Sequence, residues 1–169
     1  MKKLYLVRHA KSSWEDPDLS DFDRPLNDRG KRDAPRMAKR LREKRITPDL
    51  VLTSPAKRTF DTCREMCSAM VFPISKVSKI DSLYHASAEQ ILMVVQQLPE
   101  RVGDDEENVL LFGHNPGLTE FANLLLNEHI PNIPTAGIVA AHLKIEKWKD
   151  AKWRCGSLLF FDFPKNTKE

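Results

Sequence analysis

The sequence predicts an α/β fold: a three-layer α/β/α sandwich whose central sheet is mostly parallel, with an antiparallel edge strand. Short apolar runs alternate with segments of helical period along the 169 residues, as is typical of a parallel sheet covered on both faces. The composition, 41% hydrophobic and 30% charged, is ordinary for a soluble globular protein and excludes disordered, collagen-like and low-complexity classes. Because no linker rich in glycine, serine or proline divides the chain, we expect one domain over residues 1–169.

The first half of the chain contains three predicted strands and two predicted helices. The strands are expected at Lys3–Val7, at Leu50–Thr53 and, as a weak one, at Lys76–Ile80. A helix is expected over Asp28–Arg45, because four apolar residues from Ala34 to Leu41 recur at helical spacing. Pro35 inside this helix predicts a kink or a separated first turn. The next helix is expected from Ser54 to Met70, with Ser54 as N-cap and Pro55 in its first position.

The second half adds two helices and three strands. They are expected, in order, as a helix over Ala88–Leu98, an acidic loop over Asp104–Glu107, a strand over Asn108–Phe112, a helix from Asn115-Pro116 to Leu126, and two strands near Val139–Lys147 and Ser157–Phe163 joined by a turn around Lys149–Lys152. The strand over 108–112 is the most apolar and should be central. The two last strands should form the antiparallel edge.

Lysine and tryptophan alternate near this edge, in the run from Lys147 to Arg154. Tryptophan rings between basic residues can stack on single-stranded nucleic acid. More often such lysines protect an edge strand while the tryptophan packs inward, and we favour that interpretation.

The charge is unevenly distributed. Residues 29–45 hold nine basic and two acidic residues, a local charge of +7, so the rest of the chain carries −4 of the net +3. This pattern indicates one solvated basic helix face, and we expect no specific nucleic-acid partner. The longest apolar runs, such as Val109–Phe112, are far shorter than the ~20 residues of a membrane span, and no secretory signal is visible. We therefore expect no membrane partner and a cytoplasmic protein.

In the cytoplasm the three cysteines are expected to be reduced thiols. Cys63 and Cys67 lie four residues apart, as neighbours on one helix face, and we expect them to pack in the interior.

Arginine and histidine cluster at three strand-to-helix junctions. Arg8-His9 follows the first strand, Arg58 lies just after the second, and His114 follows the central strand. Because the carboxyl ends of parallel strands meet at one edge, where ligands bind, these four side chains can converge. Two of the junctions also begin helices, whose N-termini attract anions.

This set of residues suits the handling of a phosphoryl group. Arginine forks match phosphate oxygens, and a histidine among them can accept the phosphoryl group on one ring nitrogen while a hydrogen bond fixes the other. A second histidine, if protonated, would stabilise charge on the equatorial oxygens of the transition state.

Four ordered motifs resemble the histidine phosphatase superfamily, the phosphoglycerate mutase-like group, over residues 1–163. They are Arg8-His9-Ala10, similar to Arg-His-Gly; residues 23–30, similar to Asp-x-Pro-Leu-Thr-x-x-Gly with Asn27 for Thr; Ser54-Pro55 through Arg58 and Thr62; and Gly113-His114-Asn115. Both Asn and Thr can cap the helix that follows position 27. The short chain and the run from Arg8 to Trp14 look most like the SixA-type phosphohistidine phosphatases.

The resemblance implies a phosphoglycerate mutase-like fold and a role for each matching residue. His9 would be the phosphorylated nucleophile, and Arg8, Arg58 and His114 would hold the phosphoryl group, with Ser12 as a further binding residue. No metal and no organic cofactor are implied.

One position departs from the family pattern. Where many members carry a glutamate general acid, Leu83-Tyr84 is followed by His85, and the nearest acid is Asp81. An alkoxide leaving group needs a proton donor worth about 10²–10⁴ in rate, whereas imidazole, with a conjugate-acid pKa of about 6.5, needs much less help. The departure therefore favours a phosphoramidate such as phosphohistidine as substrate. Alternatively the proton comes from His85, from Asp81 or from a carboxylate of the loop over residues 14–23, namely Asp16, Asp18 or Asp21.

The longest loop near the site is Trp14–Asp23, which carries Asp16, Asp18 and Asp21. With little chain left for a lid, we expect a shallow, open pocket suited to a phosphate on a protein surface. The expected function is a protein phosphohistidine phosphatase. The alternatives are a general small-molecule phosphomonoesterase and a non-catalytic phosphate-binding module, so the partner is a phosphorylated protein or a small phosphorylated substrate.

Overall fold

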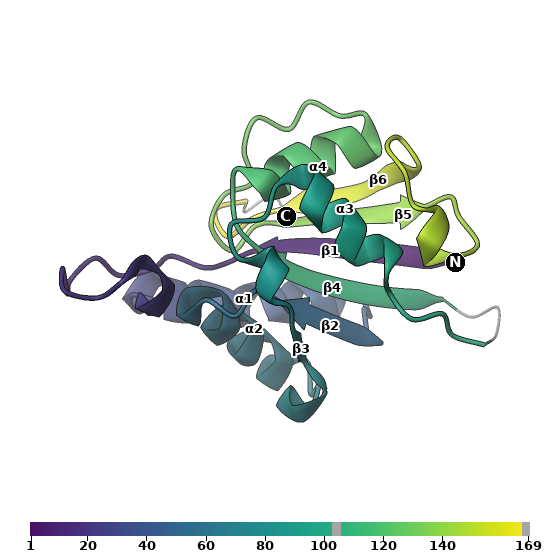
Figure 1. The fold of residues 1–169 in the computed structure, drawn as a ribbon. Coiled ribbons are helices and arrows are strands. Elements are labelled where there is room, and N and C mark those ends of the chain that lie inside the picture. Colours follow the sequence, from purple (N-terminus) through teal and green to yellow (C-terminus); the bar gives the residue numbers. More distant parts are fainter. Residues whose placement is uncertain (103–105, 167–169) are drawn as a thin grey trace.

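The computed structural model describes residues 1–102 and 106–166, in which six strands form one sheet with the order β3-β2-β4-β1-β5-β6 (Figure 1). The strands are β1 (Lys2–Arg8), β2 (Leu50–Thr53), β3 (Ser78–Lys79), β4 (Glu107–Gly113), β5 (Ile138–Leu143) and β6 (Gly156–Asp162). Strands β1 to β4 run parallel, and β5 pairs antiparallel with both β1 and β6. The predicted mostly parallel sheet with an antiparallel edge pair is confirmed.

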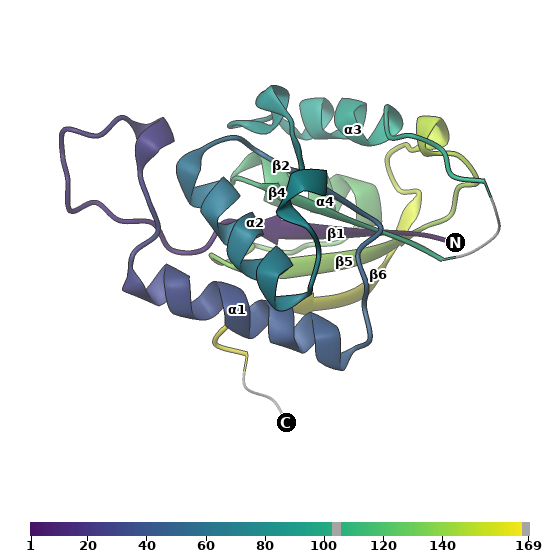
Figure 2. The ribbon, with the colours of Figure 1, turned by 90° about the horizontal axis from the view of Figure 1, so that it is seen from below.

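Two helices cover each face of the sheet, which confirms the three-layer arrangement (Figures 1 and 2). Helices α1 (Asp28–Glu43) and α2 (Lys57–Ala69) lie on one face, and α3 (Ala88–Gln96) and α4 (Gly117–Leu126) lie on the other. None of the helices in the described ranges is long and apolar enough to cross a membrane.

The alternating side chains of β1 and β4 build a core on each side of the sheet. Leu4, Leu6 and their β4 neighbours pack with α3 and α4, whereas Tyr5 and Val7 pack with α1 and α2. Every residue of β4 is buried, as expected of a central strand. The acidic loop expected over 104–107 lies partly outside the described residues, and its last residue, Glu107, belongs to β4.

The loop from residue 9 to residue 27 leaves the carboxyl end of β1, projects beyond the sheet and returns (Figure 1). Its two arms are joined by an antiparallel bridge between Ser12 and Leu26. A short 3-10 turn, Asp21–Asp23, lies within this loop. Asn27 then caps α1 by accepting a hydrogen bond from the Gly30 amide at 2.9 Å, as the motif predicted.

The predicted start of α2 is wrong. The helix begins at Lys57, and Ala56 precedes it without a side-chain cap. The Ser54 amide still donates to the Phe112 carbonyl of β4 at 3.1 Å, so the chain at Ser54 continues the strand. The Ser54 hydroxyl lies instead 2.7 Å from the ring of His114.

Helix α1 runs without a break through Pro35, so the predicted separated first turn is wrong (Figure 2). The buried face that includes Met37 and Leu41 offsets the lost hydrogen bond, because each such side chain contributes about 1.5–3 kcal/mol when buried. A kink at Pro35 stays a prediction.

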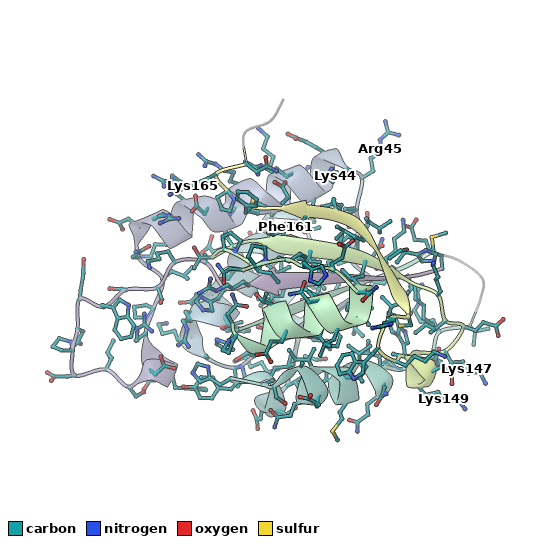
Figure 3. All side chains as sticks on the ribbon, turned by 90° about the horizontal axis from the view of Figure 1, so that it is seen from above. Lys44, Arg45, Lys147, Lys149, Phe161 and Lys165 are labelled. Carbon is teal, nitrogen blue, oxygen red and sulfur yellow. The ribbon has the colours of Figure 1, made fainter. Side chains whose placement is uncertain are left out.

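The strand predicted near Val139–Lys147 is shorter than expected, because β5 ends at Leu143. The segment that follows it is a loop with a 3-10 turn over Trp148–Asp150. The Trp148 ring is fully buried and is not free to stack on a base, as expected for inward packing. Lys147 and Lys149 lie at the outer surface of this turn (Figure 3).

Candidate active site

The parallel topology brings the three predicted junctions to one edge of the sheet. His9 follows β1, Arg58 lies in the first turn of α2 behind β2, and His114 follows β4. All three line one cavity of about 260 Å³, together with Arg8 and Ser12. The site predicted from the sequence is therefore assembled in the structure as one pocket.

His9 is buried at the floor of the pocket with one ring nitrogen engaged. Its Nδ1 lies 2.8 Å from the carbonyl oxygen of Ala10, which can only accept, so Nδ1 carries the proton and donates it. The Ala10 amide is in turn held by the Thr62 hydroxyl at 2.9 Å. Burial first, and then the charges of Arg58 and Arg8, lower the pKa of His9 to about 3. At neutral pH His9 is an uncharged imidazole with its lone pair on Nε2.

His114 is buried beside His9, with 5.4 Å between the ring centroids. Its Nε2 contacts the Ser54 hydroxyl at 2.7 Å and the Thr59 hydroxyl at 3.3 Å. Its Nδ1 lies 3.5 Å from Nη2 of Arg58, an obligate donor, so the proton of His114 is on Nε2. Burial, the neighbouring His9 and Arg58 lower its pKa to about 2.

Three arginines surround the two histidines. Arg8 donates from Nη1 to the Ile133 carbonyl at 2.9 Å, and its buried Nε has no hydrogen-bond partner among the described residues. Arg58 is 3% exposed, and Arg24 is held by the Ser12 hydroxyl at 2.5 Å. Burial first, and then the nearby charge of Arg58, lower the pKa of Arg8.

Asp21, from the loop after β1, closes one side of the pocket. Its Oδ2 accepts hydrogen bonds from Tyr84 at 2.7 Å, His85 at 2.9 Å and Arg58 at 3.0 Å, and its Oδ1 accepts one from Arg24 at 3.2 Å. Burial alone would raise the pKa of Asp21, but the bonds from Tyr84, His85 and Arg58 together hold it well below its usual range. Asp21 is therefore a carboxylate throughout the neutral range.

The two residues weighed as a general acid lie differently. His85 lines the pocket and has a left-handed backbone with φ of 49°. A positive φ is uncommon for a residue other than glycine and is often found at functional sites. Asp81 is exposed and is not part of the pocket lining.

Sequence reasoning missed several residues that shape the pocket. Arg24 had no role assigned, and Asp21 was one of three loop carboxylates without distinction. Ser54 and Thr59, the partners of His114, were read as a helix start and a motif position. No sequence pattern singles out Arg24, because its place beside the segment after His9 depends on a tertiary contact, the Ser12–Leu26 bridge.

The chain is similar to proteins of one family over most of its length. The model of the histidine phosphatase superfamily (branch 1) matches residues 4–89. An uncharacterised chloroplastic protein of Arabidopsis thaliana is 32% identical over 154 residues, which cover 89% of this chain and 70% of that protein. Phosphoserine phosphatase 1 of Hydrogenobacter thermophilus is 33% identical over 59% of this chain and 48% of its own length.

The fold is shared as well. The structure of a candidate phosphohistidine phosphatase, SixA from Agrobacterium tumefaciens, superposes with a TM-score of 0.79 at 28% identity, covering 96% of this chain and 97% of that one. The family motifs, the fold and the pocket in which the motif residues meet all indicate the same family. The chain belongs to the histidine phosphatase superfamily.

Proposed function

We propose that the chain is a phosphatase, acting as one domain, in which Nε2 of His9 takes the phosphoryl group from the substrate and passes it to water. One observation carries this proposal. The Ala10 carbonyl holds the proton of His9 on Nδ1, and burial among arginines keeps the ring uncharged, so Nε2 presents a lone pair at neutral pH. A nucleophile of this kind needs no separate base to activate it.

The neighbouring side chains supply the positive charge that phosphoryl transfer requires. Arg8, with its unpartnered Nε, and Arg58 would bind the phosphoryl oxygens, and Arg24 and Ser12 would complete the cradle. A bound dianion would raise the pKa of His114 and allow it to donate a hydrogen bond. Because side chains provide this charge, we propose that no metal cofactor is needed.

Phosphohistidine in a protein is the substrate class that the site favours. The position of the family's usual glutamate acid is occupied by His85, so an easily expelled imidazole suits the site better than an alkoxide. The similarity to a candidate phosphohistidine phosphatase supports the same class. The exposed rim, where Trp14 is 73% exposed, leaves room for a phosphate carried on a protein surface.

A general phosphomonoesterase is the second candidate, because one contact favours it. His85 Nε2 lies 2.9 Å from Asp21 at the pocket rim, so a proton donor is present near the place of a leaving group. The related phosphoserine phosphatase is consistent with this alternative.

Hydrolysis of a phosphohistidine-bearing protein and of a simple alkyl phosphate, each measured with and without EDTA, tests the proposal. The wild type should strongly prefer phosphohistidine. His9→Ala should abolish turnover, because Nε2 of His114 carries a proton toward Ser54 and Nε2 of His85 is bonded to Asp21. Activity of His9→Ala would overturn the mechanism. Equal rates on both substrates would favour the general phosphomonoesterase, absence of any turnover would indicate a binding module, and loss of activity in EDTA would show a metal requirement.

A further inference from the structure

Asp21 is a carboxylate in a pocket built for an anion. The pocket lining contains the cations Arg8, Lys11, Arg24 and Arg58, and Asp21 is the one carboxylate within that lining as the described residues define it. A negative charge beside a phosphoryl dianion opposes its binding. Asp21 therefore needs a physical role other than holding the phosphoryl group.

Its position at the rim suggests that role. His9 and Arg58 on the floor are 8% and 3% exposed, whereas the Asp21 side chain is 42% exposed. In phosphoryl transfer the attacking and leaving atoms lie roughly in line with phosphorus. With His9 attacking from the floor, the leaving group must point to the rim, where Asp21 and His85 lie.

The charge of the leaving group differs between substrate classes. A phosphorylated imidazole that carries a proton on its second ring nitrogen is cationic, and it departs as neutral imidazole. An alkyl or aryl phosphate leaves with developing negative charge on oxygen. A carboxylate at the rim stabilises the first and repels the second.

We propose that Asp21 determines specificity by accepting a hydrogen bond from the N–H of the departing imidazole, so that the pocket selects phosphohistidine over oxygen esters. In this step the bond between phosphorus and Nε2 of His9 forms as the bond between phosphorus and the leaving nitrogen breaks. The electron pair goes to the leaving nitrogen, and the proton on the other ring nitrogen stays in place beside Asp21. The inference rests on the proposed function and names the residue that sets its substrate class.

Asp21 has a second role that the test must separate. Its backbone oxygen accepts from Nη1 of Arg58 at 2.6 Å and its Oδ2 accepts from Nη2 at 3.0 Å, so it also orients this arginine. Loss of orientation would weaken turnover of every phosphate. Loss of the leaving-group contact would weaken phosphohistidine alone.

The experiment compares Asp21→Asn with the wild type on two substrates. One is a histidine peptide phosphorylated with potassium phosphoramidate, and the other is p-nitrophenyl phosphate, whose leaving group needs no proton. For Asp21→Asn we expect kcat/KM on the phosphorylated peptide, divided by kcat/KM on p-nitrophenyl phosphate, to fall about ten-fold or more relative to the wild type. The reason is that a charge-assisted hydrogen bond is replaced by a neutral one. The control is Asp18→Asn, an exposed carboxylate on the same loop outside the lining, and it should leave both rates unchanged.

The pH profile gives an independent readout. The carboxylate favours the cationic form of the bound phosphoimidazole, so turnover by the wild type should persist to higher pH than turnover by Asp21→Asn. The charged or titratable groups that face Asp21 are Arg24, Arg58, Tyr84, His85 and His114, and the variant keeps all of them.

Each outcome is decisive. A lower ratio with an earlier alkaline limb supports the inference. An equal loss on both substrates, or an unchanged ratio, overturns it and leaves Asp21 as a positioning residue for Arg58. If the wild type itself does not hydrolyse the phosphorylated peptide, the proposed substrate class fails, and this result is distinct from a failure of the Asp21 inference.

Discussion

Each of the two buried histidines has its tautomer fixed by a neighbour that can only accept or only donate. The Ala10 carbonyl holds the proton of His9 on Nδ1, and Arg58, which can only donate to Nδ1 of His114, leaves the proton of that ring on Nε2, where the Ser54 hydroxyl accepts it. The lowered pKa of each ring means that both are neutral before substrate binds. The hypothesis of a protonated His114 therefore requires the negative charge of the substrate, which would raise the pKa of the ring beside it.

Ser54→Ala tests whether this hydroxyl positions His114. The substitution removes the closest acceptor of the buried Nε2–H, leaving only Thr59 at 3.3 Å, and we expect kcat to fall about ten-fold. The ¹⁵N shift of Nε2 should change as its closest hydrogen-bond acceptor is lost, whereas Nδ1, which still faces Arg58, should keep its shift. A general structural defect would not produce this pattern. Ser68→Ala, at an exposed position of α2, is the control. Unchanged shifts and an unchanged kcat would remove Ser54 from the site.

At the residue scale the sequence predicted the side chains that follow strands and missed those on the loop. Arg8, His9, Arg58 and His114 were predictable because the ends of parallel strands must meet at one edge. Asp21 was not, because the path of a long loop depends on tertiary contacts such as its bonds to Arg58 and Tyr84. Asp16 and Asp18 have the same local chemistry and are not part of the pocket lining.

At the scale of elements, α1 buttresses the segment that carries the nucleophile. Gly30 lies in the first turn of α1, and a Cβ built there would be 2.2 Å from the carbonyl oxygen of Lys11. The same carbonyl accepts a hydrogen bond from the Asn27 amide at 3.0 Å. The backbone of α1 at Gly30 is therefore packed directly against the backbone of Lys11, two residues after His9.

Gly30→Ala should separate α1 from this segment. Because backbone cannot move aside as a side chain can, we expect a loss of about 2 kcal/mol or more in the free energy of unfolding. Gly113→Ala is the matched comparison, since its Cβ would meet only the side chains of Leu118 at 3.6 Å and Leu111 at 3.8 Å, both ordinary contacts. Urea unfolding measures both. A stability loss no larger for Gly30→Ala than for Gly113→Ala would show that the close approach is not needed.

The sequence predicted elements best where an apolar pattern extends over several turns. The predicted range of helix α1 agrees with the structure because its buried apolar residues recur at helical spacing, and because the polar cap Asn27 marks its start. The start of α2 was missed because Ser54 and Pro55 satisfy the rules for a helix N-terminus. The hydrogen bond from Ser54 to β4 and its contact with His114 are tertiary, so no local pattern reveals them.

At the scale of the whole molecule, the site lies where two cores meet at one edge of a shared sheet. His9 and His114 stay uncharged in the folded state, and this makes the free energy of unfolding depend on pH. An unfolded histidine takes up a proton below about pH 6.5, whereas His9 does so near 3 and His114 near 2. Below pH 6.5 the unfolded state therefore binds more protons than the folded state, and stability falls as the pH decreases.

Unfolding by urea between pH 7 and pH 5 measures this effect above the range in which carboxylates titrate. Each buried histidine should account for a loss of about 2 kcal/mol over this interval. His9→Gln and His114→Gln should each show a shallower dependence, because glutamine takes up no proton. His129→Gln, at an exposed position, should keep the slope of the wild type. Equal slopes in all four proteins would contradict the neutral, buried state of the two rings.

The pairing of β1 has a consequence for how the chain is made. Strand β1 lies between β4 and β5, and the residues that pair with it in both neighbours are synthesised more than a hundred residues later. At about 5–20 residues per second, β1 stays without a partner for several seconds at least. Its apolar run from Leu4 to Val7, which is buried in the folded protein, lacks its sheet neighbours for that time. The strand that leads to His9 is therefore a segment that chaperones would protect during translation.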